Sequence, residues 1–344
     1  MNNYFQNLER CLLIAEIGVN HNGDMTLAKE MIDAADESGA DAVKFQTFTA
    51  ETLVSSGTPK VKYQESTTSP DESHYEMIQA LELSREGHFL LKEYCESKKI
   101  TFLSTPYDVE SARFLHEELD VELFKSASAD LVDYLLHEYI ASTGKPSIVS
   151  VGMASLGEVE RSLEIYKKVD NHDVILLHCV SNYPCAEESL NLRVLETLKQ
   201  AFQVPVGYSD HSIGYEASVL SVAFGSKVIE KHFTTDKNLP GPDHLASSTP
   251  EEFKKLAEAV RKAEVMLGSP VKHCQSEEFQ MSQVSRKSIA VGRDLEAGSK
   301  LKKEDLVLLR PGTGLEPLLM PQIIEKTTSR KLRAGSLLDW TDLR

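Results

Sequence analysis

Residues 204–214 (VPVGYSDHSIG) and 226–236 (SKVIEKHFTTD) are two short apolar runs, and each ends in a polar cluster that contains a histidine, His211 or His232. A short apolar run that turns polar at its end is typical of a buried strand and the loop that follows it. Two neighbouring parallel strands that end in this way bring their last side chains together, where two histidines can share one metal ion. The same pattern recurs through the first 235 residues, so these segments indicate the fold as well as the site.

Eight such runs predict strands, most of them continuous apolar runs typical of strands buried on both faces. They lie at 12–18, 42–46, 101–104, 123–126, 147–151, 174–179, 204–208 and 227–232. Helical patterns lie between strands or follow the last one, at 27–38, 86–97, 155–169 and 249–267, with capping boxes at Ser155/Glu158 and Thr249/Glu252. Eight β/α units, with one insertion between 46 and 101, predict an α/β fold of the TIM (β/α)8 barrel type. A doubly wound sheet is the alternative, but it usually has fewer strands.

The chain changes character after Gly268, where the periodicity fades into a polar stretch. We expect a barrel domain over 1–270, a linker over 271–285 and a small β-rich domain over 286–344. The last domain has 12 Lys/Arg and 8 Asp/Glu, net +4, whereas the rest has 25 and 45, net −20. This split indicates either mutual attraction, within one chain or between chains, or unrelated surface charge.

Composition narrows the class of protein. The net charge of −16 argues against nucleic acid as a partner. No apolar run reaches 18 residues and the N-terminus carries charges, so we expect neither a membrane partner nor an export signal. Five widely spaced cysteines without a CxxC pair suit reduced thiols, and we expect a cytoplasmic protein.

The candidate chemistry lies at the predicted strand ends, which form one face of a barrel. Lys44 and Lys125, with nearby hydroxyl side chains, predict a pocket for a small polyanion. His211 and His232, with carboxylates such as Glu16, predict a divalent cation among nitrogen and oxygen ligands. No GxGxxG or P-loop pattern supports a nucleotide site.

Four other residues have plainer interpretations. His178 is expected to be a core histidine and Cys179 a packing residue rather than a nucleophile. His21 and His244 lie in loops, where a structural and a functional role are equally open.

Several motifs together resemble the sialic acid (N-acetylneuraminate) synthase family, which includes legionaminic and pseudaminic acid synthases. The motifs are AEIGVNHNGD (15–24), ADAVKFQTFTAETLVS (40–55), FLSTPYD (102–108), HCVSNYP (178–184), GYSDHSIG (207–214) and IEKHFTTDKNLPGPDHLAS (229–247). RKSIAVGRDL (286–295) and VLLRPGTGLEP (307–317) resemble the antifreeze-like (SAF) domain of that family. The resemblance covers essentially the whole chain.

The resemblance implies a TIM barrel enzyme, a transferase that condenses phosphoenolpyruvate with an amino-sugar aldose, releases phosphate and forms a nine-carbon 2-keto acid. It assigns to the phosphoenolpyruvate site Lys44, Gln46, Thr105, Lys125, Ser128, Ser150 and Ser209. His211 and His232 would hold a divalent metal, manganese in most members, with magnesium or cobalt as alternatives.

The resemblance also assigns residues to the acceptor. Glu16 would lie near the reacting carbons, and Tyr183 and Asp243 near the sugar. Arg310 would reach the sugar from the antifreeze-like domain of a partner chain in a domain-swapped homodimer.

The chain departs from the family pattern after the fourth predicted strand, where KIxSGE is common and residues 125–130 read KSASAD. Asp130 replaces a sugar-contacting Glu, and Ser181 stands where some members have Asn. The acceptor therefore stays open between N-acetylmannosamine and a 2,4-diacetamido-2,4,6-trideoxy sugar. A phosphoenolpyruvate–aldose phosphate synthase of the same barrel class and a catalytically inactive sugar-binding protein are the alternatives.

Overall fold

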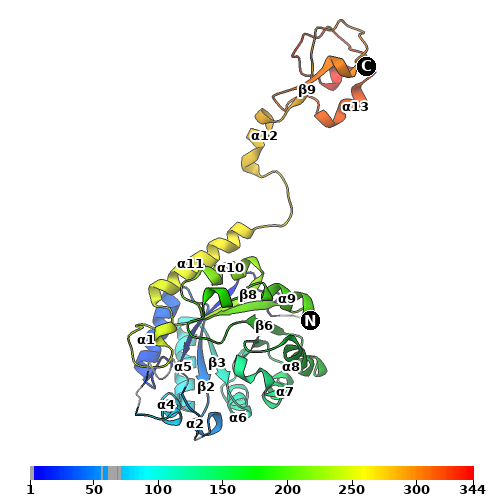
Figure 1. Ribbon diagram of the computed structural model, residues 1–344. Helices are drawn as coiled ribbons and strands as arrows, with labels where there is room; N and C mark the ends of the chain where they lie inside the picture. The colour runs from blue at the N-terminus through cyan, green and yellow to red at the C-terminus, as the bar shows by residue number, and fades with distance from the viewer. Residues whose placement is uncertain (1–3, 56, 61–67, 69–70) are drawn as a thin grey trace. The chain divides into compact units, whose positions relative to one another are not determined.

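The computed structural model describes residues 4–55, 57–60, 68 and 71–344 (Figure 1). The chain divides into two units, Met1–Gly268 and Ser269–Arg344. No helix in these described ranges is long and apolar enough to cross a membrane.

The first unit is built on eight parallel strands that follow one another in chain order around a near-barrel, in the order β3-β2-β1-β8-β7-β6-β5-β4. The strands are β1 (Leu12–Gly18), β2 (Ala42–Thr47), β3 (Thr101–Pro106), β4 (Phe124–Ser126), β5 (Ser147–Ser150), β6 (Val174–His178), β7 (Val206–Asp210) and β8 (Ser226–His232). β1 pairs with both β2 and β8, which joins the first strand to the last, and β3 contacts β4. The predicted TIM-type barrel is confirmed.

Helices surround the strands of this unit (Figure 1). They are α1 (Met25–Glu37), α2 (Ala50–Leu53), α4 (His74–Ala80), α5 (Arg85–Lys98), α6 (Val109–Arg113), α7 (Tyr134–Ser142), α8 (Leu156–Lys168), α9 (Val194–Phe202), α10 (Glu216–Ala223) and α11 (Pro250–Leu267). A π-helical turn, Phe114–Glu118, continues α6, and 3₁₀ turns lie at Ser128–Val132, Glu187–Ser189 and His244–Ala246. Both predicted capping boxes are present, at the start of α8 and of α11.

Alternation along each strand separates the barrel interior from the layer under the helices. Leu12 and Ile14 of β1 belong to the small apolar cluster inside the barrel, while Leu13 and Ala15 belong to the large cluster beneath the helices. Glu16 continues the inward series one step further along β1. The interior is therefore apolar where the strands begin and polar where they end.

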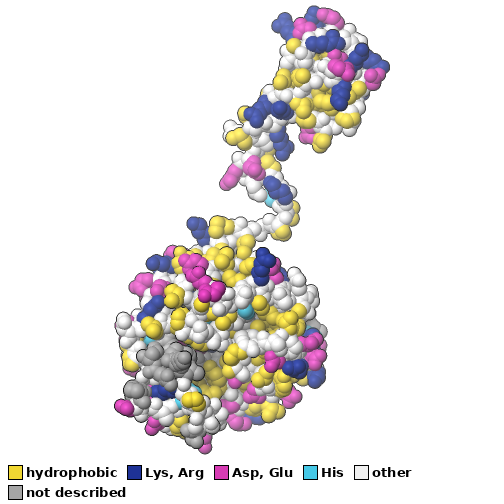
Figure 2. All heavy atoms as spheres, viewed as in Figure 1, with side chains coloured by type: hydrophobic (Ala, Val, Ile, Leu, Met, Phe, Trp, Pro, Cys, Tyr) yellow, Lys and Arg dark blue, Asp and Glu magenta, His cyan; other side chains and the backbone are white. Residues whose placement is uncertain are grey.

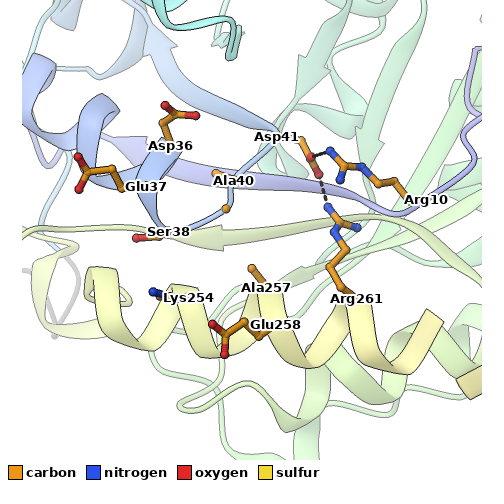
Figure 3. A pocket seen from close by; sticks show the side chains of 11 residues that line it. Arg10, Asp36, Glu37, Ser38, Ala40, Asp41, Lys254, Ala257, Glu258 and Arg261 are labelled. Carbon is orange, nitrogen blue, oxygen red and sulfur yellow. Dashed lines mark hydrogen bonds and ion pairs between the residues drawn. The ribbon is translucent and has the colours of Figure 1, made fainter. Parts of the chain in front are cut away.

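Helix α11 is attached to the first strands at the end of the barrel where the strands begin (Figure 3). Arg261 donates to Asp41 (2.6 Å) and to the carbonyl of Cys11 (2.7 Å), and Asp41 also accepts from the amide of Leu13 (2.8 Å). Arg10 pairs with the other oxygen of Asp41 at 2.5 Å. A cavity of about 630 Å³ lies beside this network, between α11 and the end of α1. Contacts at this end of a barrel serve its stability rather than its chemistry.

The second unit has its own small core around an antiparallel pair, β9 (Ser288–Val291) and β10 (Leu306–Leu309). Ile289, Val291, Leu301 and Ile323 are fully buried in it. Its helices are α12 (Phe279–Ser285) and α13 (Met320–Ile323), with 3₁₀ turns at Ser276–Glu278, Lys303–Asp305, Pro317–Leu319 and Trp340–Asp342. Lys and Arg side chains are scattered over the face of this unit seen in Figure 2.

The segment expected as a linker, 271–285, contains a helix that the sequence pattern did not predict. α12 is only seven residues long, which is too short for its apolar period to stand out. The amide of Gly312 donates to the carbonyl of Gln283 at 2.7 Å, so the end of α12 is attached to the second unit.

Candidate functional site

A cavity of about 730 Å³ lies at the carboxyl ends of the barrel strands. Because the inward side chains of all strands end at this level, residues far apart in sequence meet there. Of the predicted site residues it is lined by Glu16, Lys44, Gln46, Thr105, Lys125, Ser128, Ser150, Ser181, Tyr183, Ser209, His211, His232 and Asp243. The cavity thus combines the residues predicted for the anion with those predicted for the metal.

Two buried lysines form the cationic side of the cavity. Lys44 of β2 donates to Thr105 Oγ1 (3.0 Å), and its Nζ lies 2.7 Å from Glu16 Oε2. Lys125 of β4 donates to Ser150 Oγ (2.7 Å) and to the carbonyl of Ser126 (2.9 Å). Each lysine is thus held by a hydroxyl from the next strand of the barrel.

Glu230 of β8 lies between the two lysines, and the sequence reasoning missed it. Its Oε1 accepts from Ser209 Oγ at 2.9 Å, and its Oε2 lies 3.7 Å from Lys44 Nζ and 3.8 Å from Lys125 Nζ. An acid inside an apolar run is costly unless it is paired or used, and Glu230 in KVIEKH, like Glu16 in LLIAEIG, stands in such a run. It also stands two residues before His232, on the same face of the strand.

Burial and neighbouring charges shift the pKa values of the two carboxyl groups and the two lysines in different directions. Burial raises the pKa of Glu16 above its ordinary value, even with Lys44 beside it. Burial opposes ionisation of Glu230 as well, but Lys125 and Lys44 outweigh it and lower the pKa of Glu230. Burial lowers the pKa of Lys125, whereas for Lys44 the two carboxylates outweigh burial and raise the pKa. Glu16 is therefore the carboxyl group best suited to exchange a proton.

His211 and His232 face each other across the cavity, with ring centroids 5.7 Å apart and the Tyr183 ring 4.2 Å from that of His211. His211 Nδ1 lies 2.8 Å from the carbonyl of Val180, which makes it the protonated nitrogen and leaves a lone pair on Nε2, 3.3 Å from Ser209 Oγ. Among the described residues His232 Nδ1 is buried without a hydrogen-bond partner, 3.8 Å from Asp243 Oδ2.

These two histidines fit a divalent cation. Burial lowers the pKa of His211, and burial with the neighbouring His211 lowers that of His232 to about 3, so both rings are neutral, as metal ligands must be. Burial also raises the pKa of Asp243 to about 6. The described residues contain no group of three or more His, Cys, Asp or Glu that could hold an ion. An ion held by these two histidines would need further ligands beyond the two rings.

Asp130 and Arg310 are the predicted site residues that do not line the cavity. Ser128, which does, lies 3.0 Å from Cys179 Sγ and accepts from the amide of Gly152. Asp130 follows it in a 3₁₀ turn, where residues two apart do not share a face as they would in an extended loop. Its half-buried carboxyl has a pKa raised to about 7, chiefly by burial. Arg310 is exposed in the second unit.

The remaining polar candidates make structural bonds. His178 Nε2 lies 2.7 Å from the carbonyl of Leu190, as expected for a core histidine. Burial raises the pKa of Cys179, which suits packing rather than nucleophilic attack. His21 Nδ1 accepts from the amide of Gly23, and His244 Nδ1 lies 2.7 Å from Thr234 Oγ1.

An apolar wall, which the sequence did not predict, forms one side of the cavity. Much of it comes from the insertion between β2 and β3, in which Phe48, Met77 and Leu81 form a buried cluster with Val19. Tyr107 and Leu53 extend this wall. The cavity therefore offers charge on one side and apolar surface on another.

Comparison with known proteins agrees with the motif resemblance. The NeuB family matches residues 31–272, and the SAF domain matches residues 286–344. The chain is 46% identical over 334 residues to the N,N'-diacetyllegionaminic acid synthase of Legionella pneumophila, covering 96% of this chain and 94% of that protein. It is 33% identical over 340 residues to the pseudaminic acid synthase of Campylobacter jejuni, covering 99% and 98%.

Among solved structures, the N-acetylneuraminic acid synthetase of Leptospira borgpetersenii superposes with a TM-score of 0.72 at 37% identity. That match covers 79% of this chain and 90% of the other. The family predicted from the six motifs is confirmed. The chain belongs to the NeuB family, with a SAF domain at its C-terminal end.

Proposed function

We propose that this protein is a nonulosonic acid synthase that condenses phosphoenolpyruvate with 2,4-diacetamido-2,4,6-trideoxymannose and releases phosphate. The observation that carries the proposal is one cavity holding two buried lysines with hydroxyl partners and, beside them, two neutral histidines. The similarity to a diacetyllegionaminic acid synthase supports the choice of sugar class. The apolar wall supports it too, because methyl and acetyl groups bury favourably against such a surface.

Lys44 and Lys125 would bind the phosphate and carboxylate groups of phosphoenolpyruvate. Their ammonium groups are already fixed by Thr105 and Ser150, so little reorganisation is needed when the anion arrives. Glu230, ionised between them, keeps both lysines charged and in place. Ser209, which donates to Glu230, stands beside His211 and joins the anion side of the cavity to the histidine side.

In the reaction, the methylene carbon of phosphoenolpyruvate forms a bond to the aldehyde carbon of the sugar, and the aldehyde oxygen becomes a hydroxyl. A divalent cation held by His211 and His232, manganese or alternatively magnesium or cobalt, would supply electrophilic activation of that oxygen. Water then adds to the former enol carbon, and the phosphate leaves with its bridging oxygen as the keto group forms. Of the two protons that the water loses, one ends on the new hydroxyl group and the other on the released phosphate. Glu16, whose pKa is raised by burial, would take the first proton that the water loses.

The test is phosphate release from phosphoenolpyruvate in the presence of Mn²⁺ with three acceptors. They are 2,4-diacetamido-2,4,6-trideoxymannose, N-acetylmannosamine and N-acetylmannosamine 6-phosphate. Release with the first sugar supports the proposal, and release with N-acetylmannosamine alone would move the protein to the sialic acid branch. Release with the 6-phosphate alone, or with none of the three, would overturn it. Chelation with EDTA should abolish release, and added Mn²⁺ should restore it.

A further inference from the structure

A buried ion pair joins β7 and β8 on the side away from the cavity. Asp210 and Lys231 are register partners in the two strands, and Lys231 Nζ lies 3.0 Å from Asp210 Oδ2. Their side chains are 0% and 3% exposed. Neither residue lines the cavity, so neither touches the substrates bound there.

The polar atoms of this pair are satisfied by one short segment of chain. Asp210 Oδ1 accepts from the amide of Ser212 (2.9 Å) and from its hydroxyl (2.6 Å), and Oδ2 accepts from Ser218 Oγ (2.6 Å) of α10. Lys231 Nζ donates to the carbonyl of Ser212 at 2.8 Å. Lys231 therefore connects the end of β8 to the loop that leaves β7.

The network encloses the backbone on both sides of the metal candidates. Asp210 precedes His211, Ser212 follows it, and Lys231 precedes His232. Successive side chains of a strand point to opposite faces, so an outward pair at 210 and 231 sets where the next residues enter the barrel. On the inner face Ser209 and Glu230, also register partners, form the matching hydrogen bond.

The two histidines differ in the hydrogen bonds that orient their rings. The ring of His211 is oriented by the carbonyl of Val180, at 2.8 Å. The described part of the chain provides no hydrogen bond to His232 Nδ1. The placement of His232 therefore depends chiefly on its backbone. Its carbonyl accepts from the amide of Ser248 at 2.8 Å, and Lys231, which precedes it, ties the end of β8 to the loop after β7.

A buried ion pair is a poor source of stability, because desolvation of both charges offsets most of their attraction. Its better-attested role is to specify one arrangement of the chain over its alternatives. Here the arrangement that it specifies is the relative position of the ends of β7 and β8.

We infer that Asp210 and Lys231 are positioning residues that set the separation of His211 and His232 for a divalent cation. The inference rests on the metal half of the proposed function. It assigns the pair no contact with the ion or with either substrate.

The experiment uses the full-length chain and the ion alone. Mn²⁺ affinity is measured by titration, following the electron paramagnetic resonance signal of free Mn²⁺, and the Co²⁺-loaded protein is compared by its visible absorption spectrum. The test variant is Asp210→Asn/Lys231→Met, which removes both charges together and leaves no unpaired one buried. The matched control is Asp41→Asn/Arg261→Met, which removes the ion pair at the opposite end of the barrel.

We expect the test variant to bind Mn²⁺ about tenfold more weakly, the lower end of what loss of a supporting residue costs a metal site. Its Co²⁺ spectrum should change, whereas the control should keep wild-type affinity and spectrum. Equal affinity and an unchanged spectrum in the test variant, with Mn²⁺ binding intact in the wild type, would overturn the inference alone. A wild type that binds no Mn²⁺ would overturn the metal half of the proposed function together with the inference.

A second variant applies if the double variant does not fold, as judged by thermal unfolding without metal. Ser218→Ala removes only the hydroxyl that donates to Asp210 Oδ2 and changes no charge. A smaller loss of Mn²⁺ affinity in this variant supports the inference, and wild-type affinity contradicts it.

Discussion

At the scale of single residues, the cavity concentrates charges that a barrel interior normally excludes. Glu16, Lys44, Lys125 and Glu230 are all buried, and an isolated buried charge is costly. Two carboxyl groups facing two ammonium groups nearly cancel within the group, which makes the burial tolerable. Of the two carboxyl groups, Glu16 has the pKa that burial raises, which suits it to exchange a proton during the reaction.

The role of Glu16 predicts a defined pH dependence. Glu16 must be ionised to accept a proton, so kcat should fall as the pH drops through its pKa, which burial raises from 4.5. Glu16→Gln should lower kcat by about 10²–10⁴-fold and remove this acidic limb. Steady-state phosphate release across pH 5–9 measures both effects. An unchanged acidic limb in the variant would assign the proton transfer to another group.

Asp130 predicts a pH dependence of stability rather than of catalysis. Its folded-state pKa is raised to about 7, so its contribution to stability is fully present below the unfolded value near 3.8 and is lost as the pH rises through 7. Asp130→Asn should therefore match the wild type in thermal stability near pH 4 and exceed it increasingly up to about pH 7. Thermal unfolding at several pH values checks this. A constant difference across that range would mean that the carboxyl group is not buried as described.

At the scale of elements, the bounds of a strand could be predicted where the local sequence determines them. The bounds of β1 matched the prediction because a continuous apolar run marks both ends. β7 begins two residues later than predicted, at Val206, because Pro205 lacks the N–H that a central strand needs. This shift places Ser209 and Asp210 inside the strand. Because successive side chains point to opposite faces, Ser209 faces the cavity and Asp210 faces the ion pair with Lys231.

The features that the sequence did not predict depend on contacts between distant segments. Glu230 acquires its role from Lys44 and Lys125, which come from strands across the barrel. The apolar wall comes from the insertion between β2 and β3, whose side chains gain a surface only when packed on Val19. Asp130 does not line the cavity because its loop closes into a 3₁₀ turn. The ends of strands could be predicted from the local sequence, but the residues that contact one another across the barrel could not.

The capping box of α11 predicts an element-level effect on stability. Thr249 Oγ1 accepts from the amide of Glu252, and Glu252 Oε2 accepts from the amide of Thr249 at 2.9 Å. Thr249→Ala should reduce the free energy of unfolding by about 1 kcal/mol, as loss of such a cap does elsewhere. Thr249→Ser keeps the hydroxyl and serves as the control. Denaturant unfolding of the three proteins measures the difference, and equal stability of the Ala and Ser variants would show that the cap contributes nothing.

At the scale of the whole molecule, the SAF domain and the rest of the chain differ in charge, +4 for 286–344 and −20 for 1–285. We propose a homodimer in which the SAF domain of one chain would serve the barrel of another, a contact that opposite charges would favour. Arg310, exposed and positively charged, is the residue we propose for the contact with the sugar. Arg310→Ala should therefore raise the KM for the sugar and leave the KM for phosphoenolpyruvate unchanged.

Mixing two impaired chains tests the exchange of domains directly. His211→Ala impairs the barrel but leaves Arg310 intact, whereas Arg310→Ala leaves the barrel intact. In a swapped dimer, a mixed pair contains one intact barrel served by one intact Arg310. With the sugar well below its KM for Arg310→Ala, co-refolding should therefore restore about a quarter of wild-type activity by random pairing. Each variant refolded alone is the control and should stay impaired. If each SAF domain served its own barrel, no pairing would bring the intact parts together, and mixing would restore nothing.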